Sequence, residues 1–211
     1  MPIAGTEEVI AKTMYGSSGS TSVYTSNIMK VIASGIIKTF LKCAIVGTEV
    51  GTVGSPPPAP MVGILNCPAL QPATLAGVIT QQLLSQQVNG SKLATFINGL
   101  SLIGTHLLTA QILFIAAPTN AVGAITVVAG QITYTGADAL TMMKEEAKNV
   151  DMVNPKTKKV TEYTEKLFTA VADAIQQAIA SAIAVIDIKG GVPVAPPGPY
   201  GPLPNNSGKF L

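Results

Sequence analysis

Charge is the property that this sequence has least of. Charged residues make up 11% of its 211 residues, against about one quarter in an ordinary globular chain. All 13 cationic residues are lysines, and neither arginine nor tryptophan is present. With a net charge of only +2, the chain also lacks the arginine forks and clustered aromatic residues that usually mark a nucleic-acid site. We therefore expect no nucleic-acid partner.

Residues that support catalysis are equally sparse. His106 is the only histidine, and no carboxylate occurs in the sequence between Glu49 and Asp138, although one could approach in space. A catalytic histidine needs a nucleophile or a carboxylate nearby, so we interpret His106 as a core or interface residue. The glycines of the stretch 47–54 have neither phosphate-loop nor dinucleotide-binding spacing. The sequence therefore predicts a protein that is not an enzyme and holds no cofactor.

Cysteine is limited to Cys43 and Cys67. Two cysteines and one histidine are too few for a zinc site, and two cysteines do not make a disulfide framework. We expect no metal and interpret both as small core thiols, while a disulfide between them stays open.

Two long amphipathic helices are the strongest positive features. Apolar residues recur every three or four positions over 26–46 and again over 161–186, which is the period of a helix with one buried face. The first is followed by a glycine run and the proline run of 47–60, and the second by a Gly-Gly pair and a proline-rich tail. The same order of elements in 26–60 and 161–202 indicates either a duplication or the same physics acting at both ends.

The middle of the chain predicts further helices. Helical spacing begins near 72, resumes after the Asn-Gly turn at 89–90, and continues through an apolar stretch, 102–117, that we expect to be a separate helix. The β-branched stretch 121–135 fits either a buried strand or a small-residue helix. We favour a helix there, because 136–149 is clearly helical and extends backwards into it.

Most charged residues follow this region. The sequence around 154–157 has the composition of an exposed turn between two helices. We interpret it as a solvated loop, with a basic site at Lys156, Lys158 and Lys159 as the alternative.

These features predict a mainly α fold, namely a bundle of amphipathic helices with extended Gly/Pro-rich arms. We divide the chain into a flexible N-terminal arm (1–25), a helical domain (26–190) with a proline-rich excursion (47–72), and a proline-rich C-terminal tail (191–211).

A chain so poor in charge is expected in a membrane, in an assembly of subunits, or with a surface covered by serine, threonine, asparagine and glutamine. The membrane alternative rests on 93–117, which is uncharged and long enough to span a bilayer but carries a polar group every few residues. An assembly explains more, because apolar helix faces would be covered by neighbours and rigid proline-rich arms lose little entropy on binding. We expect partner contacts from the prolines of both arms, namely Pro56, Pro57, Pro58, Pro196 and Pro197.

The Gly-Ser-Pro-Pro-Pro run within 51–60, the Gln- and Ala-rich helical middle and the tail ending at 208–211 resemble small structural proteins of tailed-bacteriophage virions. The resemblance implies an oligomeric virion component, such as a decoration, neck, tail or baseplate subunit. Its partners would be copies of itself and other virion structural proteins, and it would be located in the virion. The alternatives are a membrane-inserting or pore-forming helical protein, and a small-molecule binder with a site in its apolar helical core.

Overall fold

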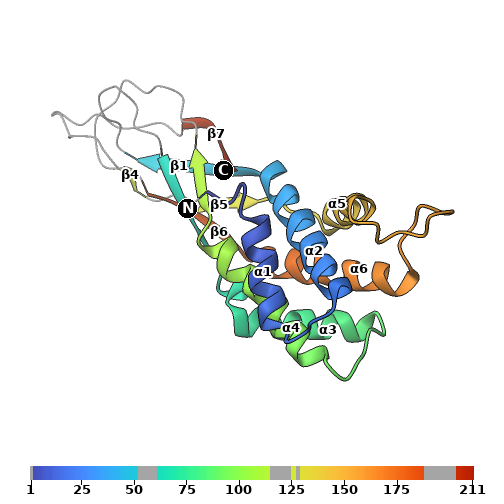
Figure 1. Ribbon diagram of the computed structural model, residues 1–211. Coiled ribbons are helices and arrows are strands. Elements are labelled where there is room, and N and C mark those ends of the chain that lie inside the picture. Colours follow the sequence, from blue (N-terminus) through green and yellow to red (C-terminus); the bar gives the residue numbers. More distant parts are fainter. Residues whose placement is uncertain (1, 52–60, 115–124, 127–128, 188–202) are drawn as a thin grey trace, which may run out of the picture.

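A computed structural model describes residues 2–51, 61–114, 125–126, 129–187 and 203–211. Helices gather in one half of the molecule and strands in the other (Figure 1). The helices in these ranges are α1 (Glu7–Ser17), α2 (Val23–Lys42), η1 (a 3₁₀ turn, Pro68–Leu70), α3 (Pro72–Ser85), α4 (Leu93–Leu108), α5 (Gly136–Asn149) and α6 (Glu162–Ile179). The strands are β1 (Ala44–Gly51), β2 (Met61–Asn66), β3 (Gln111–Phe114), β4 (Ile125–Thr126), β5 (Ala129–Ile132), β6 (Ile183–Asp187) and β7 (Leu203–Phe210).

The strands close into a small antiparallel barrel. Their order is β1-β5-β6-β2-β3-β7, and β7 pairs back with β1. The two-residue β4 pairs with β1 beyond the end of β5. Closure leaves none of these six strands with an unpaired edge, which removes the usual site of edge-to-edge aggregation.

The helices form a ring in the same circular order as the strands. Neighbours pack as α1-α2-α5-α6-α3-α4, and α4 packs back on α1. The chain therefore consists of three β-α-α-β units: β2-α3-α4-β3, β5-α5-α6-β6, and β7-α1-α2-β1. The last unit joins the two chain ends, and the Leu211 carbonyl accepts hydrogen bonds from the amides of Ile3 and Ala4.

The three units repeat in detail where the second helix passes into its strand. At each junction a backbone N–H bonds to the carbonyl three residues earlier, and both residues are buried. The bonds run from Cys43 to Phe40 (3.0 Å), from Ala110 to Leu107 (3.2 Å) and from Ala182 to Ile179 (2.7 Å). Two residues further on, Ile45, Ile112 and Ala184 are fully buried. The fold thus has an approximate threefold repeat about the barrel axis.

Burial alternates along the strands, as expected for a barrel with a filled interior. Ile45, Leu65 and Phe210 are buried, whereas their neighbours Ala44, Asn66 and Lys209 are exposed. Phe40 of α2 lies at the boundary with the helical layer, with its ring centroid 5.0 Å from those of both Tyr134 and Phe210. This aromatic cluster joins the barrel to the helices.

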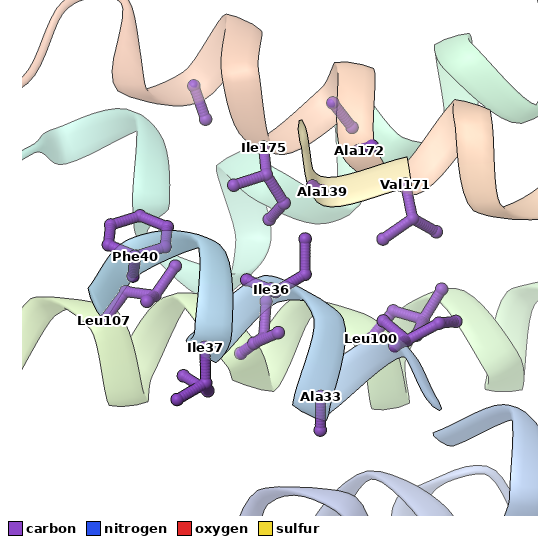
Figure 2. Close-up of a cluster of buried hydrophobic side chains, with 14 of the residues drawn as sticks. Ala33, Ile36, Ile37, Phe40, Leu100, Leu107, Ala139, Val171, Ala172 and Ile175 are labelled. Carbon is purple, nitrogen blue, oxygen red and sulfur yellow. The ribbon is translucent and has the colours of Figure 1, made fainter. Parts of the chain in front are cut away.

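The helical layer has its own apolar centre. Figure 2 shows side chains of α2, α4 and α6 gathered there, among them Ile36, Leu100, Val171 and Ile175. All four are at most 1% exposed. One apolar core therefore runs from the helices into the barrel.

Close backbone approach at α4 depends on two glycines. A Cβ at Gly99 would lie 2.7 Å from the Met14 carbonyl oxygen of α1, and a Cβ at Gly104 would overlap the Leu70 carbonyl oxygen of η1. Helix α4 runs unbroken past both glycines. They are packing positions that let neighbouring backbones touch.

The helical content of the prediction is confirmed, but the pure bundle is wrong. The helix predicted over 26–46 spans Val23–Lys42, and the one predicted over 161–186 ends at Ile179. Strands β1 and β6 follow these two helices directly. The separate helix predicted over 102–117 is also wrong, because α4 ends at Leu108 and β3 follows.

The preference for a helix over 121–135 is wrong for the described residues, of which 125–126 form β4, 129–132 form β5 and 133–135 are not helical. The two similar patterns at 26–60 and 161–202 correspond to α2-β1 and α6-β6, and α4-β3 is a third copy. Within the predicted arm 1–25, α1 packs against α2 and α4, with Ile10 and Met14 fully buried. The proposed division into arm, domain and tail stays a prediction.

Replacement of Gly104 by alanine should lower the free energy of unfolding by about 3 kcal/mol, because the new methyl group meets a backbone oxygen that cannot easily move. Gly77→Ala is the matched control: a Cβ there has no atom within 4 Å, and alanine in the middle of α3 should stabilise by up to about 1 kcal/mol. Urea denaturation followed by circular dichroism measures both. Equal effects of the two substitutions would contradict this packing role.

Candidate interaction surface

Charge is divided unevenly between the two halves of the molecule. The strands and the segments joining them cover 44–66, 111–135 and 183–211, and the sequence of these segments contains only four charged residues. These are Glu49, Asp187, Lys189 and Lys209. The remaining charged residues of the chain belong to the helical half. A surface that faces water normally carries charged side chains throughout. The charge-poor half is therefore the candidate for contact with other molecules.

The outer wall of the barrel exposes aliphatic side chains. Val46 on β1 is 63% exposed, Ile64 on β2 is 54% exposed, and Ile183 on β6 is 46% exposed. An antiparallel wall that faces water normally alternates apolar residues inside with polar residues outside. In this barrel, other apolar residues fill the inward-facing positions. The exposed aliphatic residues on the outer wall therefore do not contribute to the core.

The strand register brings these aliphatic residues onto one side of the barrel. Val46 lies opposite Gln131, which lies opposite Ile183, so the three form a row across β1, β5 and β6. Ile64 lies opposite Val185 on β6, two residues from Ile183. We call Val46, Ile64, Gln131, Ile183 and Val185 the barrel wall patch. Directly opposite residues are about 5 Å apart, so the patch is continuous.

Lys209 lies at one edge of the barrel wall patch, because its partner on β1, Ala44, is two residues from Val46. Among the barrel side chains that the structure describes, it is the charged one, and it lies on β7 opposite Ala44 and Leu113. The barrel wall patch itself contains four aliphatic side chains and one neutral amide. It can therefore pack against an apolar surface without leaving an ion without a partner.

The far end of the barrel is where the units are joined to each other. The described ends of β1, β3 and β6 and the beginnings of β2, β4 and β7 all lie away from the helices (Figure 1). The segments between them are rich in proline and glycine. The five residues predicted as partner contacts, Pro56, Pro57, Pro58, Pro196 and Pro197, lie outside the described residues, so that prediction stays untested.

Both cysteines lie in the core, as expected. Cys43 and Cys67 are buried and free, so they do not form a disulfide in this structure. Burial raises the pKa of the Cys43 thiol to about 12. Burial also raises the pKa of Cys67, whose Sγ donates to the Ala178 carbonyl at 3.0 Å. Neither thiol has the lowered pKa that is typical of a reactive cysteine.

Two other titratable groups are withdrawn from solvent, one partly and one almost fully. His106 is half-buried on α4, and burial lowers its pKa. The Tyr134 hydroxyl is buried without a hydrogen-bond partner among the described residues, and burial raises its pKa. Within the described part of the chain, no three His, Cys, Asp or Glu residues are grouped so as to hold a metal ion.

Ion pairs tie α5 to its neighbours. Lys38 of α2 pairs with Glu146, and Lys144 pairs with Glu165 of α6. Burial acts to raise the pKa of Glu146, but the hydrogen bond and the charge of Lys38 outweigh it, so the net shift is downward. Some charged residues of the helical half therefore form contacts between helices.

Comparisons with protein-family models, with curated proteins and with solved structures find no match to this chain. In the described ranges, no helix has both the length and the apolar character needed to cross a membrane. The stretch 93–117, on which the membrane alternative rested, is not one helix, because it passes from α4 into β3.

Neither cysteine should react with a thiol reagent at pH 8 while the protein is folded, because both sulfurs are buried and burial raises the pKa of both thiols, that of Cys43 to about 12. Both should react after unfolding in urea. The exposed Ser91, replaced by cysteine, is the control that should react at once in the folded protein. Fast labelling of Cys43 in the native state would contradict its assignment to the core.

Proposed function

We propose that this chain is a non-enzymatic structural subunit of a large assembly, namely a virion component of the decoration, neck, tail or baseplate kind. The observation that carries the proposal is the barrel wall patch, which lies in the charge-poor half of the molecule. The phage assignment is supported by the resemblance of the sequence to small virion proteins.

The energetics favour covering this patch. Burial of apolar surface contributes about 25 cal/mol per Å², so a fully buried valine or isoleucine side chain contributes about 1.5–3 kcal/mol. Val46, Ile64 and Ile183 each keep roughly half or more of their surface exposed in the isolated chain. An interface that covers them removes this exposure, while the charged helical half stays in water.

The partners in this proposal are copies of the chain and other virion structural proteins. A stable interface of this kind usually buries more than about 1,000 Å² in total, with an apolar centre and a polar rim. The barrel wall patch, which includes the Gln131 amide, supplies the centre, and Asn66 opposite Ile183 supplies an amide group for the rim. The proline-rich segments that join the barrel strands would add contacts to neighbouring subunits.

The apolar helical core, which was the alternative site for a small molecule, is occupied by side chains at its centre (Figure 2). The interface therefore remains the function that the described surface supports best.

Sedimentation velocity of the purified chain tests the proposal. We expect a defined multimer, and the double variant I64K/I183K should weaken its association by about 100-fold or more, because two ammonium groups would be buried without partners. The matched control is V23K/L84K, which replaces two exposed aliphatic residues of the helical half, 75% and 60% exposed. The control should assemble as the wild type does.

A wild-type chain that stays monomeric at all concentrations, and that does not copurify with virus particles, would overturn the proposed function. Equal effects of the two double variants would show that the assembly does not use the barrel wall patch.

A further inference from the structure

The threefold repeat reveals an addition in one unit. The two helices of each pair are joined by 18–22 in the first pair, by 86–92 in the second, and by the longer segment 150–161 in the third. Figure 1 shows this third connection, in orange, projecting from the helical layer beyond α5 and α6. Because the other two units pack equivalent helices with short links, the fold itself does not require the longer segment.

The added segment is held in one conformation by its own hydrogen bonds. The Asn154 amide donates to the Lys159 carbonyl, and the Lys158 amide donates to the Asn154 carbonyl, both at 2.8 Å. The Asn154 side-chain oxygen accepts from the amides of Lys156 and Thr157 at 2.9 and 3.2 Å. Lys158 is held at a φ of 56°, a left-handed conformation that is uncommon for lysine. The predicted exposed turn is confirmed, and its lysines project from a closed loop.

This loop and the two helices enclose a groove of about 290 Å³. We call it the lysine groove. Its lining residues are Lys144 and Lys148 of α5, Lys158, Lys159 and Val160 of the added segment, and Glu165 of α6. The fold therefore gathers four lysines that are up to 15 positions apart in the sequence.

One carboxylate already lies in the lysine groove. Glu165 pairs with Lys144, and within the described part of the chain Lys148, Lys158 and Lys159 have no carboxylate within 4 Å. Gathered ammonium groups repel one another unless an anion lies between them. In the groove, one lysine is thus paired with a carboxylate, and three lysines are available to pair with further carboxylates.

The lining of the groove distinguishes among anions. It offers no arginine fork for a bidentate phosphate contact and no aromatic ring on which a base could stack. It does offer Val160, half-buried, and several separate ammonium groups. Several separate ammonium groups suit an anion that carries several separate carboxylates, such as an acidic peptide segment.

We propose that the lysine groove binds an acidic segment of a partner protein, whose carboxylates pair with Lys148, Lys158 and Lys159. The groove lies in the helical half, away from the barrel wall patch, and its occupation does not depend on the proposed function. The chain would then have two docking surfaces of opposite character, one apolar and one cationic.

Fluorescence anisotropy with a labelled hexaglutamate peptide tests this proposal, at about 20 mM and about 300 mM NaCl. The wild-type chain should bind the peptide at low salt and lose most of its affinity at high salt. Removal of the three available lysines should weaken binding by about tenfold or more, given the modest worth of each exposed ion pair. The groove variant is K148Q/K158Q/K159Q.

The control variant K30Q/K42Q/K92Q removes the same charge from exposed lysines elsewhere on the helical half, and should change the affinity by less than about twofold. Melting curves establish that both variants are folded, and K159Q alone replaces the groove variant if it is not. Three results would each overturn the proposal: no peptide binding at low salt, equal losses in both variants, or tighter binding of a DNA duplex through the same lysines.

Discussion

Closure of the barrel by β7 is the constraint on which the rest of the structure depends. This strand pairs with β1 on one side and β3 on the other, although it comes from the opposite end of the chain. Phe210 brings its ring against Phe40 of α2, and Leu211 binds the backbone at the N-terminus. Without β7, two strands would have open edges and the interior around Ile45 and Ile112 would meet water. The last nine residues thus complete both the barrel and the threefold repeat.

The closed ring also separates the surface into two kinds. Each unit begins and ends in the barrel and turns back through its helix pair, so all the helices lie on one side of the barrel and the strand-to-strand connections begin and end on the other. The charged residues lie mainly in the helical half, where several form ion pairs between helices. The outer wall of the barrel exposes aliphatic residues instead. This separation is the physical basis of the proposed role as a subunit with one buried and one solvated half.

The helices could be predicted because their signal is local. A stripe with a period of 3.6 residues identified α2 and α6 to within a few residues at three of their four ends. The exception is the C-terminal end of α6. Strand β6 follows α6 almost directly, and its Ile183 and Ile186 happen to continue the spacing of the helix stripe. Other strands carry glycine, at positions such as Gly63 and Gly130, and pair with segments far away in the sequence. These strands form because they pair into a closed barrel, and no local sequence pattern indicates that pairing.

The candidate surfaces were hidden for the same reason. Val46, Ile64 and Ile183 belong to three separate segments, and only the strand register shows that they share one side of the barrel. The lysines at 156–159 were visible as a charged loop, but Lys144 and Lys148 join them only because α5 packs on α6. The missing signal is spatial in both cases.

Removal of β7 tests most directly whether barrel and helices form one closed unit. Urea unfolding of the chain truncated after residue 202, followed by the helical circular dichroism signal, compares it with the full chain. If closure holds the helices in place, the truncated chain loses its cooperative helical transition, or unfolds at much lower urea. A helical transition that keeps its full amplitude and midpoint would show that the helices stand without the barrel, and would contradict this account.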